Sequence, residues 1–185
     1  MCLTLHLIFS STLDHLSVDS SPFAETIINI ITRRSLESLK LVRSVASQFR
    51  ASPSKPIAAT PSFFILSILA PLHALFTSRP ALTTYRSAWS TRIVDSILVS
   101  YAGILASVRK TEDLLRRHRK SKKTGFSLFG SGGDGKEEDV EEERFRTQMR
   151  VDIEALRRDA EGLEVDVDAL EGWRELSEVV DRPAE

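Results

Sequence analysis

A long run of apolar residues at helical spacing constrains the fold of this chain more than any other feature. The apolar side chains step by three or four residues almost throughout: Leu82, Tyr85, Trp89, Ile93, Ile97, Tyr101, Ile104, Val108 and Leu115. This spacing predicts one helix over about 80–120, roughly 60 Å long at 1.5 Å per residue. A helix of this length is stable only when other elements pack along its apolar face. The rest of the chain must therefore supply those elements.

A second amphipathic stretch lies in the first fifty residues. Residues 1–19 are ambiguous, but Ser21 followed by Pro22 is the pattern of a helix N-cap and the first helical residue. Apolar residues then recur at helical spacing: Phe23, Ile27, Ile30, Ile31, Leu39, Val42, Val45 and Phe49. We predict an N-terminal helical segment over 1–50. The proline- and serine-rich stretch that follows predicts a linker over 51–60, because it cannot continue a helix.

A mostly apolar helix is predicted over 61–77. Thr60 and Pro61 repeat the cap-and-proline pattern, and the stretch is hydrophobic around most of its circumference, which predicts a central position. Pro71 removes one backbone donor and is expected to kink this helix. Within the long helix, Gly103 costs roughly 1 kcal/mol relative to alanine. A close neighbouring helix at Gly103 would be one reason for that glycine.

The last third of the chain predicts a linker and two shorter helices. Residues 124–139 contain five glycines, as in a flexible linker. A second stripe of apolar residues follows: Phe145, Met149, Ile153, Leu156, Ala160 and Leu163. The segment 168–171 has the pattern of a capping box, which predicts a last helix with an inward face. That face consists of Leu170, Trp173, Leu176 and Val180.

These elements together predict an all-α fold. Because strand-like alternation is not sustained anywhere, we expect an antiparallel helical bundle or rod with one long central helix and short C-terminal helices. The division we predict is an N-terminal helical segment (1–50), a linker (51–60), a helical core (61–123), a glycine-rich linker (124–139) and C-terminal helices (140–181).

Known catalytic and metal-binding patterns are not recognisable in the sequence. The single cysteine, Cys2, rules out an intrachain disulfide and fits a reducing compartment. The four histidines (His6, His15, His73 and His118) lack metal-ligand spacing. The serines lack a nucleophile elbow, and the glycine-rich GSGGDG lacks the flanking residues of a phosphate loop. We therefore expect a protein that is not an enzyme, with no catalytic residue, no cofactor and no metal.

Two apolar segments raise the question of a membrane. The first, over 3–11, lacks the basic start and the cleavage site of a signal peptide. The second, over 61–76, is shorter than the roughly 20 apolar residues that a span requires. We expect both to be packed helix and any membrane contact to be peripheral.

A dense basic run ends the long helix and allows two interpretations. Its six cations are Arg116, Arg117, Arg119, Lys120, Lys122 and Lys123. They could form a surface for a polyanion such as anionic lipid. They could instead be the solvated end of a helix, where cations meet the negative end of the dipole and pair with the acidic run 137–143 across the linker. We favour the second interpretation because charge runs are usually solvated faces. Nucleic acid is not expected, because the net charge is −1 and aromatic residues do not alternate with the cations.

Two motifs lie on either side of the glycine-rich insert. The first consists of Val108, Lys110, Thr111, Glu112, Asp113, Leu115, Arg116 and Arg117, and the second of Arg146, Gln148, Asp152 and Ile153. They resemble the C-terminal region of subunit 2 of the conserved oligomeric Golgi complex. In that family the first motif reads Val-x-[Lys/Arg]-[Thr/Met]-Glu-[Asp/Glu]-x-Leu-[Lys/Arg]-[Lys/Arg], and the second reads Arg-x-Gln-x-x-x-Asp-[Ile/Val]. The resemblance covers about residues 61–180.

The resemblance implies a non-catalytic subunit of a vesicle tether that acts in retrograde transport within the Golgi. Its implied partners are the other subunits of that complex, with peripheral contact to the cytoplasmic face of the Golgi membrane, and its implied fold is a helical rod. The long N-terminal coiled coil of the family has no counterpart in this sequence. We therefore expect a fragment, a truncated gene model or a divergent short form.

Overall fold

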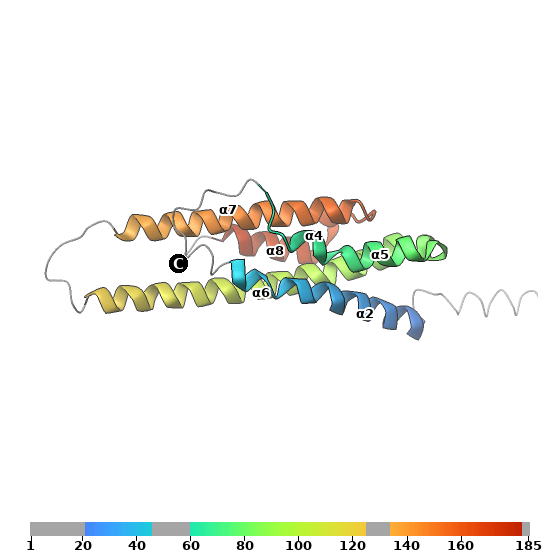
Figure 1. Ribbon diagram of the computed structural model, residues 1–185, viewed down its shortest axis with the longest axis horizontal. Helices are drawn as coiled ribbons and strands as arrows, with labels where there is room; N and C mark the ends of the chain where they lie inside the picture. The colour runs from blue at the N-terminus through green and yellow to red at the C-terminus, as the bar shows by residue number, and fades with distance from the viewer. Residues whose placement is uncertain (1–20, 46–59, 125–133, 183–185) are drawn as a thin grey trace, which may run out of the picture.

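The computed structural model describes residues 21–45, 60–124 and 134–182, and every regular element in those ranges is helical. The all-α prediction is confirmed. The long helix α6 (Arg86–Thr124) and the helix α7 (Asp134–Glu161) run antiparallel along the long axis of the molecule (Figure 1). The short helix α8 (Glu171–Asp181) lies between them, and helix α2 (Pro22–Leu39) packs along α6. The expectations for 1–20, 46–59 and 125–133 lie outside the described residues.

Helix α6 confirms the prediction of one long helix. It contains 39 residues, and a 3-10 helix, η2 (Pro80–Tyr85), leads into it. Its inward face forms the centre of the core, with Trp89, Ile93, Ile97, Tyr101 and Leu105 buried. The buried side chains of α2, α7 and α8 contribute to the same cluster. The bundle therefore has one continuous core around the first two thirds of α6.

This helix also has the length and composition of a membrane span, which we did not expect for any segment. A window of 18 residues within Pro80–Leu115 has a mean hydropathy of 1.4, and 44% of that window is buried in the bundle. Two of its charged side chains bond with other helices: Arg92 pairs with Glu25 at 2.7 Å, and Asp95 accepts a hydrogen bond from the Gly172 backbone N–H at 3.0 Å. Packing in the core of the bundle therefore accounts for the apolar composition of α6.

Helix α2 begins where the sequence predicted and buries one face. The Ser21 hydroxyl accepts a hydrogen bond from the Ala24 backbone N–H at 3.1 Å, which confirms the N-cap. The buried face is Ala24, Ile28, Ile31, Ser35 and Leu39. Two of the periodic apolar residues, Phe23 and Ile30, lie outside this face and are 82% and 48% exposed. A turn at 40–41 interrupts the helix before residues 42–45 become helical again.

The apolar helix predicted over 61–77 is two helices, so this prediction was wrong in part. Helix α4 (Ile65–Ile68) and helix α5 (Ala70–Ser78) are separated at Leu69, and Pro71 lies at the start of α5. In a continuous helix the proline ring would clash with the carbonyl four residues earlier, and its nitrogen could not donate. Pro71 therefore starts a new helix here instead of kinking one. The predicted central position is confirmed for one face only: that face buries Phe64, Ile65, Ile68, Leu69 and Leu72, whereas Phe63 and Leu66 are exposed.

Helix α7 starts earlier than the sequence suggested. The glycine-rich linker was predicted over 124–139 and the C-terminal helices over 140–181, but the helix begins at Asp134. Acidic residues in the first turns of a helix interact favourably with its positive end, which explains helix formation at 134–139. The predicted stripe from Phe145 to Leu163 is buried throughout, which confirms the inward face of this helix.

The start of α8 is fixed by α6 and not by a capping box. The capping box predicted over 168–171 is wrong: the N-cap is Leu170, and Asp168 lies in the 3-10 helix η3 (Val167–Ala169). The N–H that a local cap would satisfy is bound by the Asp95 carboxylate of α6. Sequence patterns detect caps only within a few residues, so a carboxylate 77 residues away is invisible to them.

The close helix contact occurs at Gly172 and not at Gly103. A Cβ at Gly172 would lie 2.8 Å from the Asp95 carbonyl oxygen and 2.9 Å from the Val99 nitrogen. At Gly103 a Cβ would meet no atom within 4 Å. The explanation suggested for Gly103 was therefore wrong, and Gly172 is the glycine that lets α8 approach the backbone of α6.

Candidate interaction surface

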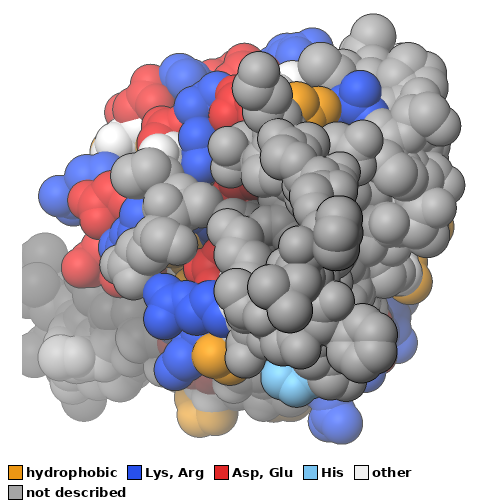
Figure 2. Space-filling view, turned by 90° about the vertical axis from the view of Figure 1, so that its left-hand side faces the viewer, with side chains coloured by type: hydrophobic (Ala, Val, Ile, Leu, Met, Phe, Trp, Pro, Cys, Tyr) orange, Lys and Arg blue, Asp and Glu red, His pale blue; other side chains and the backbone are white. Residues whose placement is uncertain are grey.

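The basic run lies on the last turns of α6, at one end of the molecule (Figure 1). The backbone is helical through Thr124, so the run continues the long helix. Arg117 has an exposed side chain. The side chains of Arg116, Arg119, Lys120, Lys122 and Lys123 lie outside the described residues. Figure 2 shows this end of the molecule, where the described Lys and Arg side chains alternate with Asp and Glu.

Glu142 and Glu143 are the acidic-run residues whose side chains are described, and both form ion pairs. Glu142 pairs with Arg109 at 3.1 Å and with Arg146 at 3.4 Å. Glu143 pairs with Arg146 at 3.1 Å and with Arg150 at 3.8 Å. Arg109 lies before the basic run, so its pair with Glu142 does not test the predicted pairing of 137–143 with 116–123 across the linker. That pairing stays a prediction.

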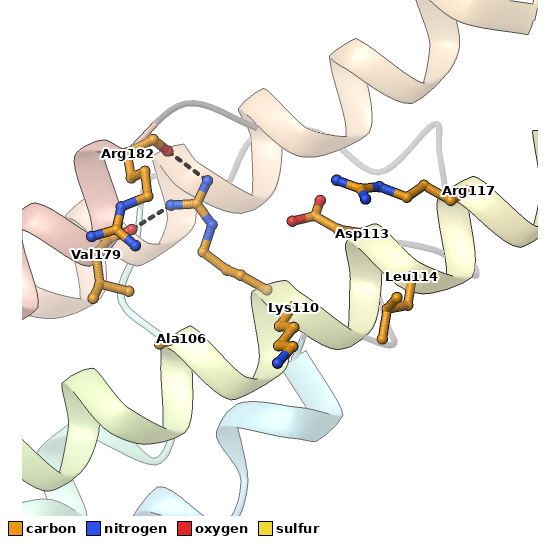
Figure 3. Close-up of a pocket in the computed structure, with 8 residues that line it drawn as sticks. Ala106, Lys110, Asp113, Leu114, Arg117, Val179 and Arg182 are labelled. Carbon is orange, nitrogen blue, oxygen red and sulfur yellow. Dashed lines mark hydrogen bonds between the residues drawn. The ribbon is translucent and has the colours of Figure 1, made fainter. Parts of the chain in front are cut away.

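Arg109 joins three helices at the point where α8 ends. Its guanidinium donates to the Val179 carbonyl and, at 2.6 Å, to the Arg182 carbonyl (Figure 3). It also reaches Glu142 on α7, and both side chains of that pair are nearly buried. A cation at a helix C-terminus satisfies carbonyls that have no partner within the helix. Arg109 therefore caps α8 and ties it to α6 and α7.

An open groove of about 320 Å³ lies next to Arg109, between α6 and the end of α8 (Figure 3). Helix α6 contributes Ala106, Arg109, Lys110, Asp113, Leu114 and Arg117, and the end of α8 contributes Val179 and Arg182. Asp113 and Arg117 project to the same side of α6, whereas Lys110 and Leu114 project to the other side. Four of these side chains are cationic and one is a carboxylate, so the groove carries an excess of positive charge.

The second motif forms a buried polar clamp that sequence reasoning did not find. Asp152 is fully buried and accepts hydrogen bonds from the Ser62 backbone N–H and hydroxyl, both at 2.7 Å. Gln148, one turn earlier, donates to Asp152 at 2.8 Å and to the Thr60 carbonyl at 3.2 Å. Burial raises the pKa of Asp152, and the bonds from Ser62 and Gln148 partly oppose that rise. The clamp holds segment 60–62 on α7.

A signal for this clamp was present in the sequence. Gln148 and Asp152 are polar residues on the same face of the helix as Met149, Ile153 and Leu156, a face that had to be buried. A buried carboxylate without partners would cost several kcal/mol, so partners from another segment were required. Which segment supplies them cannot be read from the helical pattern. The clamp fixes segment 60–62 against α7 through hydrogen bonds within the protein.

The titratable groups of the described residues do not gather into a metal site. Within 21–45, 60–124 and 134–182, no three His, Cys, Asp or Glu side chains are placed to hold a metal ion. His73 bonds through Nε2 to Asp159 at 2.8 Å and links α5 to α7. Its role in the structure is to connect two helices.

Comparison with known proteins gives one finding. Neither a curated protein nor a solved structure matches the chain. A family model described as "COG complex component, COG2, C-terminal" matches residues 4–153. The match includes both motifs, α2, α4, α5, α6 and most of α7, and it supports the resemblance inferred from the sequence. The chain therefore belongs to the family of the C-terminal region of COG2, a component of the COG complex.

Proposed function

We propose that the chain serves as a non-catalytic part of a vesicle-tethering complex in retrograde transport within the Golgi. It works through protein–protein contacts of its helical surfaces, on the cytoplasmic face of the Golgi membrane, and its partners are the other subunits of the conserved oligomeric Golgi complex. Membership in the family of a complex component is the observation that carries this proposal.

The architecture supports a scaffold. The core is continuous, and the buried carboxylate and the nearly buried Arg109 are both occupied in joining helices. The outer surface carries exposed apolar side chains, among them Phe63 and Leu66 at the short helix α4 and Leu114 on α6. Such faces suit helix-to-helix association with other proteins.

Co-elution with purified sister subunits tests this proposal. The chain at micromolar concentration, shown to be folded by circular dichroism, is mixed with each subunit in turn and passed over a sizing column. We expect it to co-elute with at least one subunit. If the folded chain elutes alone in every mixture, the assembly proposal is wrong.

A second candidate function is binding to an anionic membrane through the basic run. The observation that favours it is the position of the basic run on the last turns of α6, at one end of the molecule. Near anionic lipid each cation would contribute about 1 kcal/mol.

Flotation with vesicles of phosphatidylcholine and phosphatidylserine tests this second function. We expect the chain to float at low salt and to lose that property when Arg116, Arg117 and Lys120 are replaced by glutamate. Flotation that survives the replacement, or that is absent at low salt, would exclude this surface as a membrane contact.

A further inference from the structure

The groove at the end of α8 has cationic walls, and the described part of the chain places no ion-pair partner on three of its cations. Among the described residues, no carboxylate lies within ion-pair distance of Lys110, Arg117 or Arg182, whereas Arg109 is satisfied by Glu142. All three of these side chains are exposed. They surround a groove in which Asp113 is the carboxylate. The local field therefore favours an anionic occupant.

The same groove has an apolar component that a simple counter-ion would not need. Ala106 and Val179 line it, and Leu114 lies beside them with 58% of its surface exposed. Helix α8 ends at Asp181, whereas α6 continues to Thr124. Beyond the end of α8, Figure 1 shows α6 and α7 extending side by side without α8 between them. The groove thus opens where one layer of the bundle stops.

We propose that this groove binds an acidic amphipathic helix of a protein partner. The apolar residues of that helix would contact Ala106, Leu114 and Val179, and its Asp or Glu side chains would pair with Lys110, Arg117 and Arg182. The occupant would continue the layer that α8 begins, so it would meet α6 in the helix-to-helix geometry already present in the bundle. That the partner is a sister subunit rests on the proposed function, whereas the charge and the apolar face of the occupant rest on the groove.

The mixed lining favours a helix over a lipid headgroup or a nucleic acid. An amphipathic helix places apolar anchors at spacings of three and four, with charged residues beside them. Complementary charge at the edge of an apolar contact raises the association rate and excludes wrong partners. Among the described residues, no aromatic side chain that could stack a base lines the groove.

The test combines a groove variant with a matched control. The groove variant carries Lys110→Glu and Arg117→Glu, two exposed positions on α6. The control carries Arg34→Glu and Arg174→Glu, which make the same change in charge at exposed positions on α2 and α8 outside the groove. Both should unfold like the unmodified chain, because surface changes without partners alter stability by about 0.5 kcal/mol or less.

Binding is measured first with the purified sister subunit that co-elutes with the unmodified chain. We expect the groove variant to lose about tenfold or more in affinity and the control to stay within about twofold, with a loss of affinity at high salt. If the unmodified chain binds and the groove variant binds equally well, the groove proposal is wrong while the proposed function stands.

A synthetic probe decides the case in which no subunit binds. The probe is a helical peptide of about five turns with leucine on one face and glutamate on the other, and its partner peptide carries lysine in place of glutamate. Binding of the glutamate peptide that the groove variant abolishes supports the groove although the proposed function has failed. Equal binding of both peptides, no binding of either, or binding of anionic vesicles alone overturns it.

Discussion

Residues 86–108 and 109–124 belong to one uninterrupted helix, yet the two parts of α6 have opposite surroundings. In the first part, which we call the covered part, Trp89, Ile93, Ile97 and Leu105 are buried against α2, α8 and their neighbours. In the second, the uncovered part, none of the described side chains from 109 to 118 is buried, and Leu114 and Leu115 are 58% and 39% exposed. Apolar periodicity alone does not distinguish them. The lengths of the covering helices do, because α8 contains only 11 residues.

The largest expected effect comes from one substitution made in both parts of α6. Leu105→Ala in the covered part should lower the free energy of unfolding by about 2–5 kcal/mol, because it leaves a cavity in the core. Leu114→Ala in the uncovered part should change it by about 0.5 kcal/mol or less. Urea unfolding followed by circular dichroism measures both. Equal losses at the two positions would mean that the uncovered part is packed after all.

A smaller loss is expected where α8 covers α6. In Gly172→Ala the new methyl group would overlap the backbone of α6 at Asp95 and Val99, so α8 must move away. Overpacking of this kind costs about 1–3 kcal/mol. The same urea experiment measures it. A variant as stable as the unmodified chain would show that α8 does not approach α6 this closely.

The free energy of unfolding should depend on pH in a way that reflects the burial of Asp152. Because burial raises the pKa of Asp152 in the folded chain, the folded state binds more protons than the unfolded state between the ordinary carboxyl pKa, near 4, and the raised one. The contribution of Asp152 therefore falls as pH rises through that window, by about 1.4 kcal/mol for each unit between the two pKa values. Unfolding across this pH range measures the slope. In Asp152→Asn this part of the slope should be absent, and an unchanged slope would assign it to other groups.

The smallest effect should have the opposite sign. Gly103 lies within the covered part of α6, but on a side where an added Cβ meets no atom within 4 Å. Gly103→Ala should therefore raise the free energy of unfolding by about 0.5–1 kcal/mol, the difference in helix propensity. A thermal unfolding scan should show a higher midpoint. A lower midpoint would mean that a neighbour occupies this side of α6.

The sequence predicted those parts of the fold that depend on local pattern. The stripe from Trp89 to Val108, the cap at Ser21 and the inward face of α7 are set by residues a few positions apart, and all three were confirmed. The break at Leu69 was missed because a proline can either kink a helix or start a new one, and which occurs depends on its neighbours.

The candidate surface was harder to predict than the fold. The basic run was visible as composition, but the groove depends on where α8 stops and on Arg109, whose partners are 33 to 73 residues away. The Asp152 clamp and the contact at Gly172 likewise join segments far apart in the sequence. Helical periodicity shows that a face is buried and does not show which residue lies against it.

Hydrogen–deuterium exchange along α6 tests the central claim most directly. The claim is that the covered part holds the bundle together while the uncovered part is a surface for other proteins. We predict slow exchange at 86–108 in the free chain, and new protection at 109–118 on addition of the sister subunit that co-elutes with it. A complex in which 109–118 exchanges as fast as in the free chain would contradict the account.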